Sequence, residues 1–124
     1  MNPEQNFNIS ELATEFDIST RTIRYYEEIG LLNPKRDGNR RIYTRSDRTR
    51  LKLILRGKKF GFSLEEIKEM IQLFDEDRTG KRQLEKTIEY GNAKISEIET
   101  RIIELIELRD ALTNLKNEFE KKLK

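Results

Sequence analysis

Apolar residues recur at helical spacing in a short block near the start of the chain, between residues 9 and 16. Asn8 and Glu11 stand at its beginning with the spacing of a capping box, in which each side chain satisfies a backbone N–H of the other residue. The pattern stops at Asp17, so a first short helix is expected to end there.

A second helix is predicted from Ser19 to Gly30. Serine is a favoured N-cap residue, and glycine readily adopts the left-handed conformation that ends a helix. Ile23 and Tyr26 are expected to face the core. Two short helices separated by about four residues form a helix-turn-helix pattern.

The pattern changes to extended structure after residue 32. Pro34 is incompatible with a helix interior, and the Asp-Gly-Asn sequence at residues 37–39 is a hairpin-turn signal. Arg41, Ile42 and Tyr43 then alternate in a strand-like manner. The segment therefore predicts a small two-stranded wing.

Two further helices are predicted after the wing. Thr44 and Asp47 form a second capping-box pair, and Ser63 and Glu66 form a third. The first of these helices should end near residue 61 and the second near residue 74. Their expected core-facing residues are Leu51, Ile54 and Leu55 in the first helix and Leu64, Ile67, Met70, Ile71 and Phe74 in the second.

The chain after the polar connector at residues 75–80 has the pattern of one long helix. Its apolar positions alternate by four and three residues, as in a heptad seam, and then shift by three residues in a stammer-like discontinuity. The seam consists of Leu84, Ile88, Gly91, Ile95, Ile98, Ile102 and Leu105, followed by Leu108, Leu112, Leu115 and Phe119. A single helix cannot bury this seam, so we expect dimerisation with the same helix of a second chain. The alternative is a helix that folds back on its own head.

These elements predict a mainly α protein. A winged helix-turn-helix DNA-binding head with a small β wing is expected over residues 1–74. A connector at 75–80 and a C-terminal coiled-coil dimerisation helix at 81–124 follow it.

The composition excludes several kinds of chemistry. Charged residues make up 39% of the 124 residues, and there is no cysteine and no histidine. Disulfides, thiolate metal sites and Cys or His catalysis are therefore excluded, and no metal site or cofactor is expected. No apolar run is long enough to cross a membrane and no signal peptide is visible, so a cytoplasmic location is expected.

The charge is unevenly distributed along the chain. Residues 1–62 hold 13 Lys or Arg and 8 Asp or Glu, a net charge of +5, whereas residues 63–124 hold 12 and 15, a net charge of −3. A basic half joined to an acidic half indicates a head that binds a polyanion and a solvated tail that self-associates. The alternative is an ordinary charged surface.

The candidate DNA-binding residues lie on the second helix and the wing. The N-terminal residues of such a helix enter the major groove, where arginine binds guanine or phosphate and tyrosine hydroxyls contact phosphate. The candidates are Thr20, Arg21, Arg24 and Tyr25 on the helix and Arg40, Arg41 and Tyr43 on the wing. Alternatively, one or two of them form intramolecular ion pairs, with Glu27 or Glu28 available to Arg24 at helical spacing.

The order of these motifs resembles the MerR family of transcription regulators. The sequence "TIRYYEEIGLL", a glycine-turn wing ending in "RIY", a helix running into "GKKFGFSLEEI" and a coiled-coil helix match that family over nearly the whole chain. The resemblance implies a winged-helix head, a homodimer through an antiparallel coiled coil, and binding to pseudo-palindromic promoter DNA where RNA polymerase is a partner. Family DNA contacts map onto Arg21, Arg24, Tyr25, Arg41 and Tyr43.

Some features depart from the family pattern or narrow it. Many members have a tyrosine where this chain has Arg40. The arginine replaces the tyrosine with a positive charge that can bind phosphate. Metal-sensing members carry cysteines at the coiled-coil ends, and this chain has none. Residues 37–75 look most like the LiuR-type branch, which is linked to amino acid and acyl-CoA catabolism and implies a small-molecule effector of that class.

Two other function classes compete with a DNA-binding regulator. A coiled-coil adaptor that binds protein without a DNA function would explain the long helix, but not the dense arginine and tyrosine residues of the head. An enzyme is disfavoured, because no nucleophile–base pair and no phosphate-cradling glycine loop occurs in the sequence.

Overall fold

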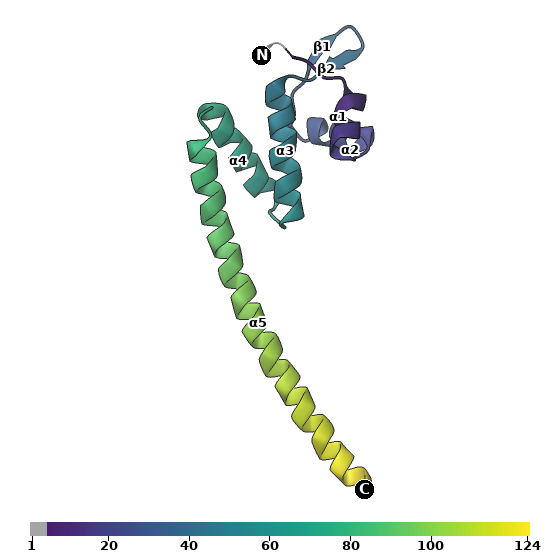
Figure 1. Cartoon of the computed structure of the whole chain (residues 1–124), viewed down its shortest axis with the longest axis vertical. Coiled ribbons are helices and arrows are strands. Elements are labelled where there is room, and N and C mark those ends of the chain that lie inside the picture. The colour runs from purple at the N-terminus through teal and green to yellow at the C-terminus, as the bar shows by residue number, and fades with distance from the viewer. Residues whose placement is uncertain (1–4) are drawn as a thin grey trace. The chain divides into compact units, whose positions relative to one another are not determined.

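The computed structural model describes residues 5–124 and is mainly helical, with a two-stranded antiparallel wing and a long C-terminal helix (Figure 1). This is the fold class that the sequence predicts. The chain divides into two compact units, Met1–Gln83 and Leu84–Lys124, and each is considered separately below. We call the first unit the head.

The helix-turn-helix forms as predicted. In α1 (Ile9–Phe16), Asn8 Oδ1 accepts a hydrogen bond from the backbone N–H of Glu11 at 2.8 Å, and the Glu11 carboxylate accepts one from the N–H of Asn8 at 2.9 Å. Asp17 has φ 54° and ψ 49°, the left-handed conformation that ends α1 and opens the turn. The next helix, α2 (Thr20–Glu28), buries Ile23 and Tyr26 against the head.

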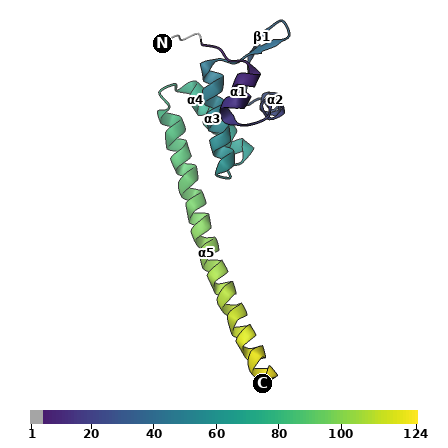
Figure 2. The ribbon, with the colours of Figure 1, turned by 45° about the vertical axis from the view of Figure 1, so that its right-hand side comes forward.

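The wing is a tight hairpin of β1 (Lys35–Asp37) and β2 (Arg40–Ile42), which projects from the head (Figure 2). Gly38 has φ +63°, which a side chain rarely adopts, and it makes the two-residue turn possible. The backbone of Tyr43 also pairs with that of Phe7 through two hydrogen bonds of 2.8 and 2.9 Å. The sequence did not indicate this bridge, because one residue pair has no periodicity.

Two antiparallel helices complete the head, α3 (Arg45–Lys59) and α4 (Leu64–Glu76), each beginning with the capping box that the sequence predicts. Leu51 and Ile54 are fully buried as expected, but Leu55 is only half-buried and Leu53 is buried instead. Leu53 lies one turn before Gly57, on the side of α3 that packs on α4. The core-facing arc of α3 is therefore wider than a single stripe.

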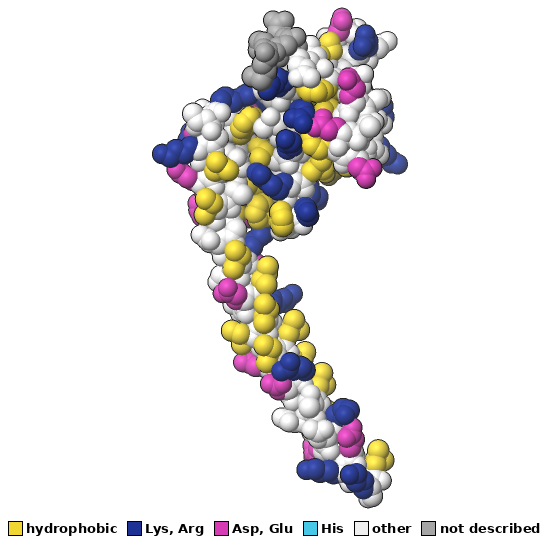
Figure 3. Space-filling view, in the orientation of Figure 1, with side chains coloured by type: hydrophobic (Ala, Val, Ile, Leu, Met, Phe, Trp, Pro, Cys, Tyr) yellow, Lys and Arg dark blue, Asp and Glu magenta, His cyan; other side chains and the backbone are white. Residues whose placement is uncertain are grey.

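The helix α5 (Lys81–Leu123) is continuous over 43 residues, about 65 Å at 1.5 Å per residue. The stammer-like shift in its seam does not interrupt it. Each large apolar residue of the predicted seam is exposed, from 45% for Leu115 to 62% for Ile88, and Figure 3 shows hydrophobic side chains gathered along the helix surface. Ile103, Ile106 and Leu123, which the seam did not include, are exposed as well.

None of the helices within residues 5–124 combines the length and the apolar composition that a membrane span requires.

The contact between α3 and α4 generates the first prediction. A Cβ atom added to Gly57 would lie 2.7 Å from Cγ1 of Ile67. This atom is bonded to the branched Cβ of a fully buried side chain. Overpacking of this kind costs about 1–3 kcal/mol, whereas replacing glycine within a helix gains at most about 1 kcal/mol. We expect Gly57→Ala to lower the free energy of unfolding, measured by urea titration with circular dichroism.

The matched control is the same substitution in a protein that carries Ile67→Ala. There the clash is absent, so Gly57→Ala should be neutral or stabilising. Equal effects of Gly57→Ala in both backgrounds would show that the two helices do not make this close contact.

Candidate nucleic-acid interface

The outer face of α2 carries the side chains that the sequence selected for recognition. Arg21, Arg24 and Tyr25 are exposed, and Thr20 is partly exposed at the first position of the helix. Tyr25 is 46% exposed, with its ring centroid 5.8 Å from that of the buried Tyr26. The buried residues thus anchor α2 while the arginines face outward.

An open hollow of about 640 Å³ lies between α2 and the wing. It brings together residues that are up to twenty positions apart in the chain and that form a strongly charged surface. Its lining residues are Arg21, Arg24, Tyr25, Glu27, Glu28, Arg36 and Arg41. Four of the predicted DNA-binding residues therefore share one concave surface with Arg36, which the sequence reasoning did not select.

The carboxylate of Glu27 makes two ion pairs with the wing. Its Oε2 atom accepts a hydrogen bond from Nε of Arg41 at 2.7 Å, and its Oε1 atom accepts one from Nη2 of Arg36 at 3.1 Å. The alternative ion pair between Arg24 and Glu27 or Glu28 does not occur among the described residues. The intramolecular pair forms instead with Arg41, because the fold places the wing beside the last turn of α2.

The remaining wing residues lie in contrasting positions. Arg40 is exposed and forms no ion pair with any residue that the structure describes. Tyr43 is fully buried, and its hydroxyl makes no hydrogen bond within the described part of the chain. The expectation that Tyr43 presents its side chain to DNA does not fit this structure, since the Phe7 bridge and the start of α3 hold it in the core.

The environment of the Tyr43 phenol keeps it neutral. Burial raises its pKa above the ordinary value, and the nearby carboxylate of Glu27 raises it further. Arg41 and Arg24 act in the opposite direction with smaller effects. The phenol therefore lies within electrostatic range of the charged hollow without opening onto it.

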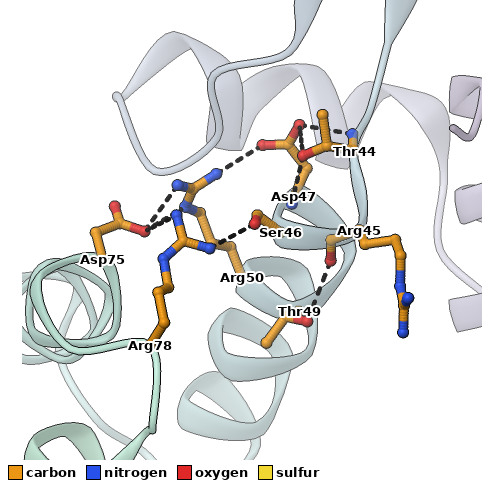
Figure 4. A network of polar contacts seen from close by, with 8 residues as sticks. All are labelled: Thr44, Arg45, Ser46, Asp47, Thr49, Arg50, Asp75 and Arg78. Carbon is orange, nitrogen blue, oxygen red and sulfur yellow. Dashed lines mark hydrogen bonds and ion pairs between the residues drawn. The ribbon is translucent and has the colours of Figure 1, made fainter. Parts of the chain in front are cut away.

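A polar network holds the base of the wing (Figure 4). The carboxylate of Asp47, which is 1% exposed, accepts hydrogen bonds from the backbone N–H and the hydroxyl of Thr44, just after β2. Arg50 binds Asp47 at 2.9 Å and Asp75, near the end of α4, at 2.7 Å. Arg78 extends the network by donating to the hydroxyl of Ser46 at 2.5 Å. The wing, α3 and α4 are thus joined through one buried carboxylate.

This arrangement is suited to binding a polyanion. Guanidinium groups donate up to five N–H bonds and match phosphate and guanine edges, and α2 presents two of them with one helical turn between them. Of the acidic residues that line the hollow, Glu27 forms ion pairs with arginines and Glu28 is exposed. The described residues contain no group of three or more acidic, Cys or His side chains placed to hold a metal ion.

Comparisons with known proteins agree with this interpretation. Residues 7–73 match the model of the MerR HTH family regulatory protein, and residues 48–115 match the model described as MerR, DNA binding. The chain is 38% identical to the HTH-type transcriptional regulator HmrR of Rhizobium leguminosarum bv. viciae, covering 87% of this chain and 82% of that protein. It is 36% identical to CueR of Salmonella typhimurium, covering 87% and 78%.

Solved structures show the same likeness. HiNmlR, a MerR family regulator lacking the sensor domain and bound to promoter DNA, is 26% identical with a TM-score of 0.56, over 79% of each chain. A transcription regulator of Ralstonia metallidurans CH34 in complex with lead(II) is 28% identical with a TM-score of 0.54, over 83% of this chain and 85% of that one.

Proposed function

The chain belongs to the MerR family of DNA-binding transcriptional regulators, and from that premise we propose that it binds pseudo-palindromic promoter DNA as a homodimer and acts there on transcription by RNA polymerase. The observation that carries this proposal is the hollow between α2 and the wing, which gathers four arginines on one surface. A protein-binding adaptor without a DNA function would not need this arrangement. The relatives of this chain are transcriptional regulators rather than enzymes.

The proposed DNA contacts divide into two kinds. Arg21 lies in the first turn of α2, where a side chain reaches base edges in the major groove. Arg24 and Tyr25 lie about one turn further along, where the helix surface approaches the DNA backbone. Arg40, exposed at the start of β2, supports a contact from the wing to phosphate.

The exposed seam of α5 supports the homodimer. Ten large apolar residues at heptad-like spacing are between 45% and 62% exposed, on a helix about 65 Å long. Hydrophobic surface of this extent and period is typical of a coiled-coil interface. A second copy of α5 offers a matching seam, and residues 81–124 are therefore proposed as the dimerisation element.

The effector of this chain is proposed to differ from a thiophilic metal ion. One relative, with 32% identity, is named heavy metal-dependent transcription regulator 2. Soft and borderline metals are bound in proteins mainly by cysteine and histidine, and none of the 124 residues is either. The resemblance of residues 37–75 to the LiuR-type branch supports an acyl-CoA or related metabolite as the signal, and control of amino acid or acyl-CoA catabolism.

The DNA contacts can be tested by fluorescence anisotropy with duplexes selected by the wild-type protein from a random pool, and with scrambled duplexes. Arg21→Ala should cost about 1–3 kcal/mol on the selected duplex and relax the preference at one base pair in each half-site. Arg40→Ala should weaken binding to both duplexes and lower the salt slope by about one unit per subunit.

The control for these variants is Lys68→Ala, which removes one exposed positive charge from α4, outside the hollow. It should change neither the preference nor the slope by a comparable amount. Unaltered affinity of both Arg21→Ala and Arg40→Ala would refute the proposed interface.

The homodimer can be tested with Ile98→Lys/Ile102→Lys, which places two charges one turn apart in the seam. An unpaired charge in an apolar interface costs several kcal/mol, so sedimentation equilibrium should show monomers. Ser96→Lys/Thr100→Lys adds the same charges with the same spacing on the opposite face of α5 and should leave a dimer. If each of the two double variants still forms a dimer, the seam is not the dimer interface.

The proposed effector class can be tested by calorimetry and by DNA binding. Titration with Zn²⁺ or Cu⁺ should give no sub-micromolar binding, because the chain offers no thiolate or imidazole ligand. A panel of acyl-CoA thioesters should shift the affinity for the selected duplex, with free coenzyme A as the control. Tight metal binding would overturn the first statement, and indifference to the whole panel would overturn the second.

A further inference from the structure

The wing brings two arginines into direct opposition. Arg36 of β1 and Arg41 of β2 are paired in the antiparallel register of the hairpin. Like charges directly opposite each other across two strands destabilise a hairpin. The carboxylate of Glu27 receives both guanidinium groups, at 3.1 Å from Arg36 and 2.7 Å from Arg41, and so removes this repulsion.

The position of Glu27 is unfavourable for α2 considered alone. It lies one residue before the end of the helix, where a negative charge opposes the helix dipole, and the last turn carries no basic residue. Its side chain is only 19% exposed. The two wing arginines therefore supply the charge that stabilises Glu27 there, and the carboxylate in turn ties both strands of the wing to α2.

We propose that Glu27 is a positioning residue that sets the specificity of DNA binding by fixing the wing relative to α2. This inference rests on the proposed DNA-binding function and assigns a role within the same site. Arg41 uses its Nε–H for Glu27 and Arg36 uses an Nη2 group, so each guanidinium retains other N–H groups for phosphate. The wing thus approaches the DNA backbone from one defined place while α2 is in register with the bases.

Glu27 also limits the binding of Arg36 and Arg41 to DNA phosphates when α2 is not in register with the bases. A carboxylate that holds both groups competes with phosphates that approach from other directions. Removing the carboxylate releases two mobile cations beside the interface, and these bind any duplex through counterion release. Positioning therefore predicts a loss of discrimination together with a gain in non-specific binding.

The test measures the affinities of the full-length protein for its selected duplex and for a scrambled duplex at several salt concentrations. Glu27→Gln should strengthen binding to the scrambled duplex and steepen its salt slope by about one to two units per subunit. The ratio of the two affinities should fall by about tenfold, as for the loss of one ordered contact in each half-site. Circular dichroism verifies that the variant is folded.

Two further variants separate position from charge. Glu28→Gln makes the same charge change at the next residue, which is exposed and forms no ion pair with a described residue. It should raise both affinities by a similar factor and keep their ratio. Glu27→Asp keeps the charge but shortens the side chain by one methylene group, so only positioning predicts that it lowers the ratio.

The outcomes distinguish this inference from the function on which it rests. Wild-type protein that does not discriminate between the duplexes overturns the proposed function and the inference with it. Wild-type discrimination that Glu27→Gln and Glu27→Asp leave intact overturns the role of Glu27 alone. A fall in the ratio for both Glu27 variants, with Glu28→Gln unchanged in ratio, supports it.

Discussion

The architecture of the head depends on the hydrogen bonds and the ion pair that the buried carboxylate of Asp47 accepts. This carboxylate is almost fully buried, and it accepts hydrogen bonds from Arg50 and from Thr44, the N-cap residue of α3, with which it forms a capping box. Arg50 reaches Asp75 and so connects this carboxylate to α4. A buried charge is tolerated only when it is fully paired, and removing one partner typically costs about 3–5 kcal/mol. The network therefore holds wing, α3 and α4 in one arrangement.

The arginines of the basic half perform two different tasks. Arg48 binds Glu15 across α1 and α3, and this hydrogen bond lowers the pKa of the Glu15 carboxyl below its ordinary value. Arg50 is likewise committed to the fold. Arg21 and Arg24 are exposed and form no ion pair with the described residues, so their charge is available to a ligand. The net charge of the head is thus a poor guide to its binding surface, because much of it is neutralised locally.

The exposed seam of α5 and the lack of cysteine and histidine in the 124 residues bear on two different aspects of the proposed function, its assembly and its signal. The fold and the DNA-binding head are those of the MerR family. The seam supports the proposed homodimer, and none of the 124 residues offers a thiolate or an imidazole as a ligand for a metal ion.

Local patterns in the sequence determined most of the elements of this protein. Capping boxes, the glycine turn of the wing and the helical periods located each helix and the wing, because these signals depend on residues that lie near one another in the chain. The anchoring of α2 by Ile23 and Tyr26 and the outward direction of Arg21 and Arg24 followed from the same period. Residues with short-range roles were thus readable before the fold was known.

Tertiary structure alone decided which charges meet and which side chains are buried. Glu27 pairs with Arg36 and Arg41, nine and fourteen positions away, rather than with Arg24 on its own helix. Tyr43 is enclosed by the Phe7 bridge and the core, and Leu53 is buried because α3 packs on α4 as well. Such contacts depend on how the wing and the helices are oriented in space, and a one-dimensional period carries no information about that orientation.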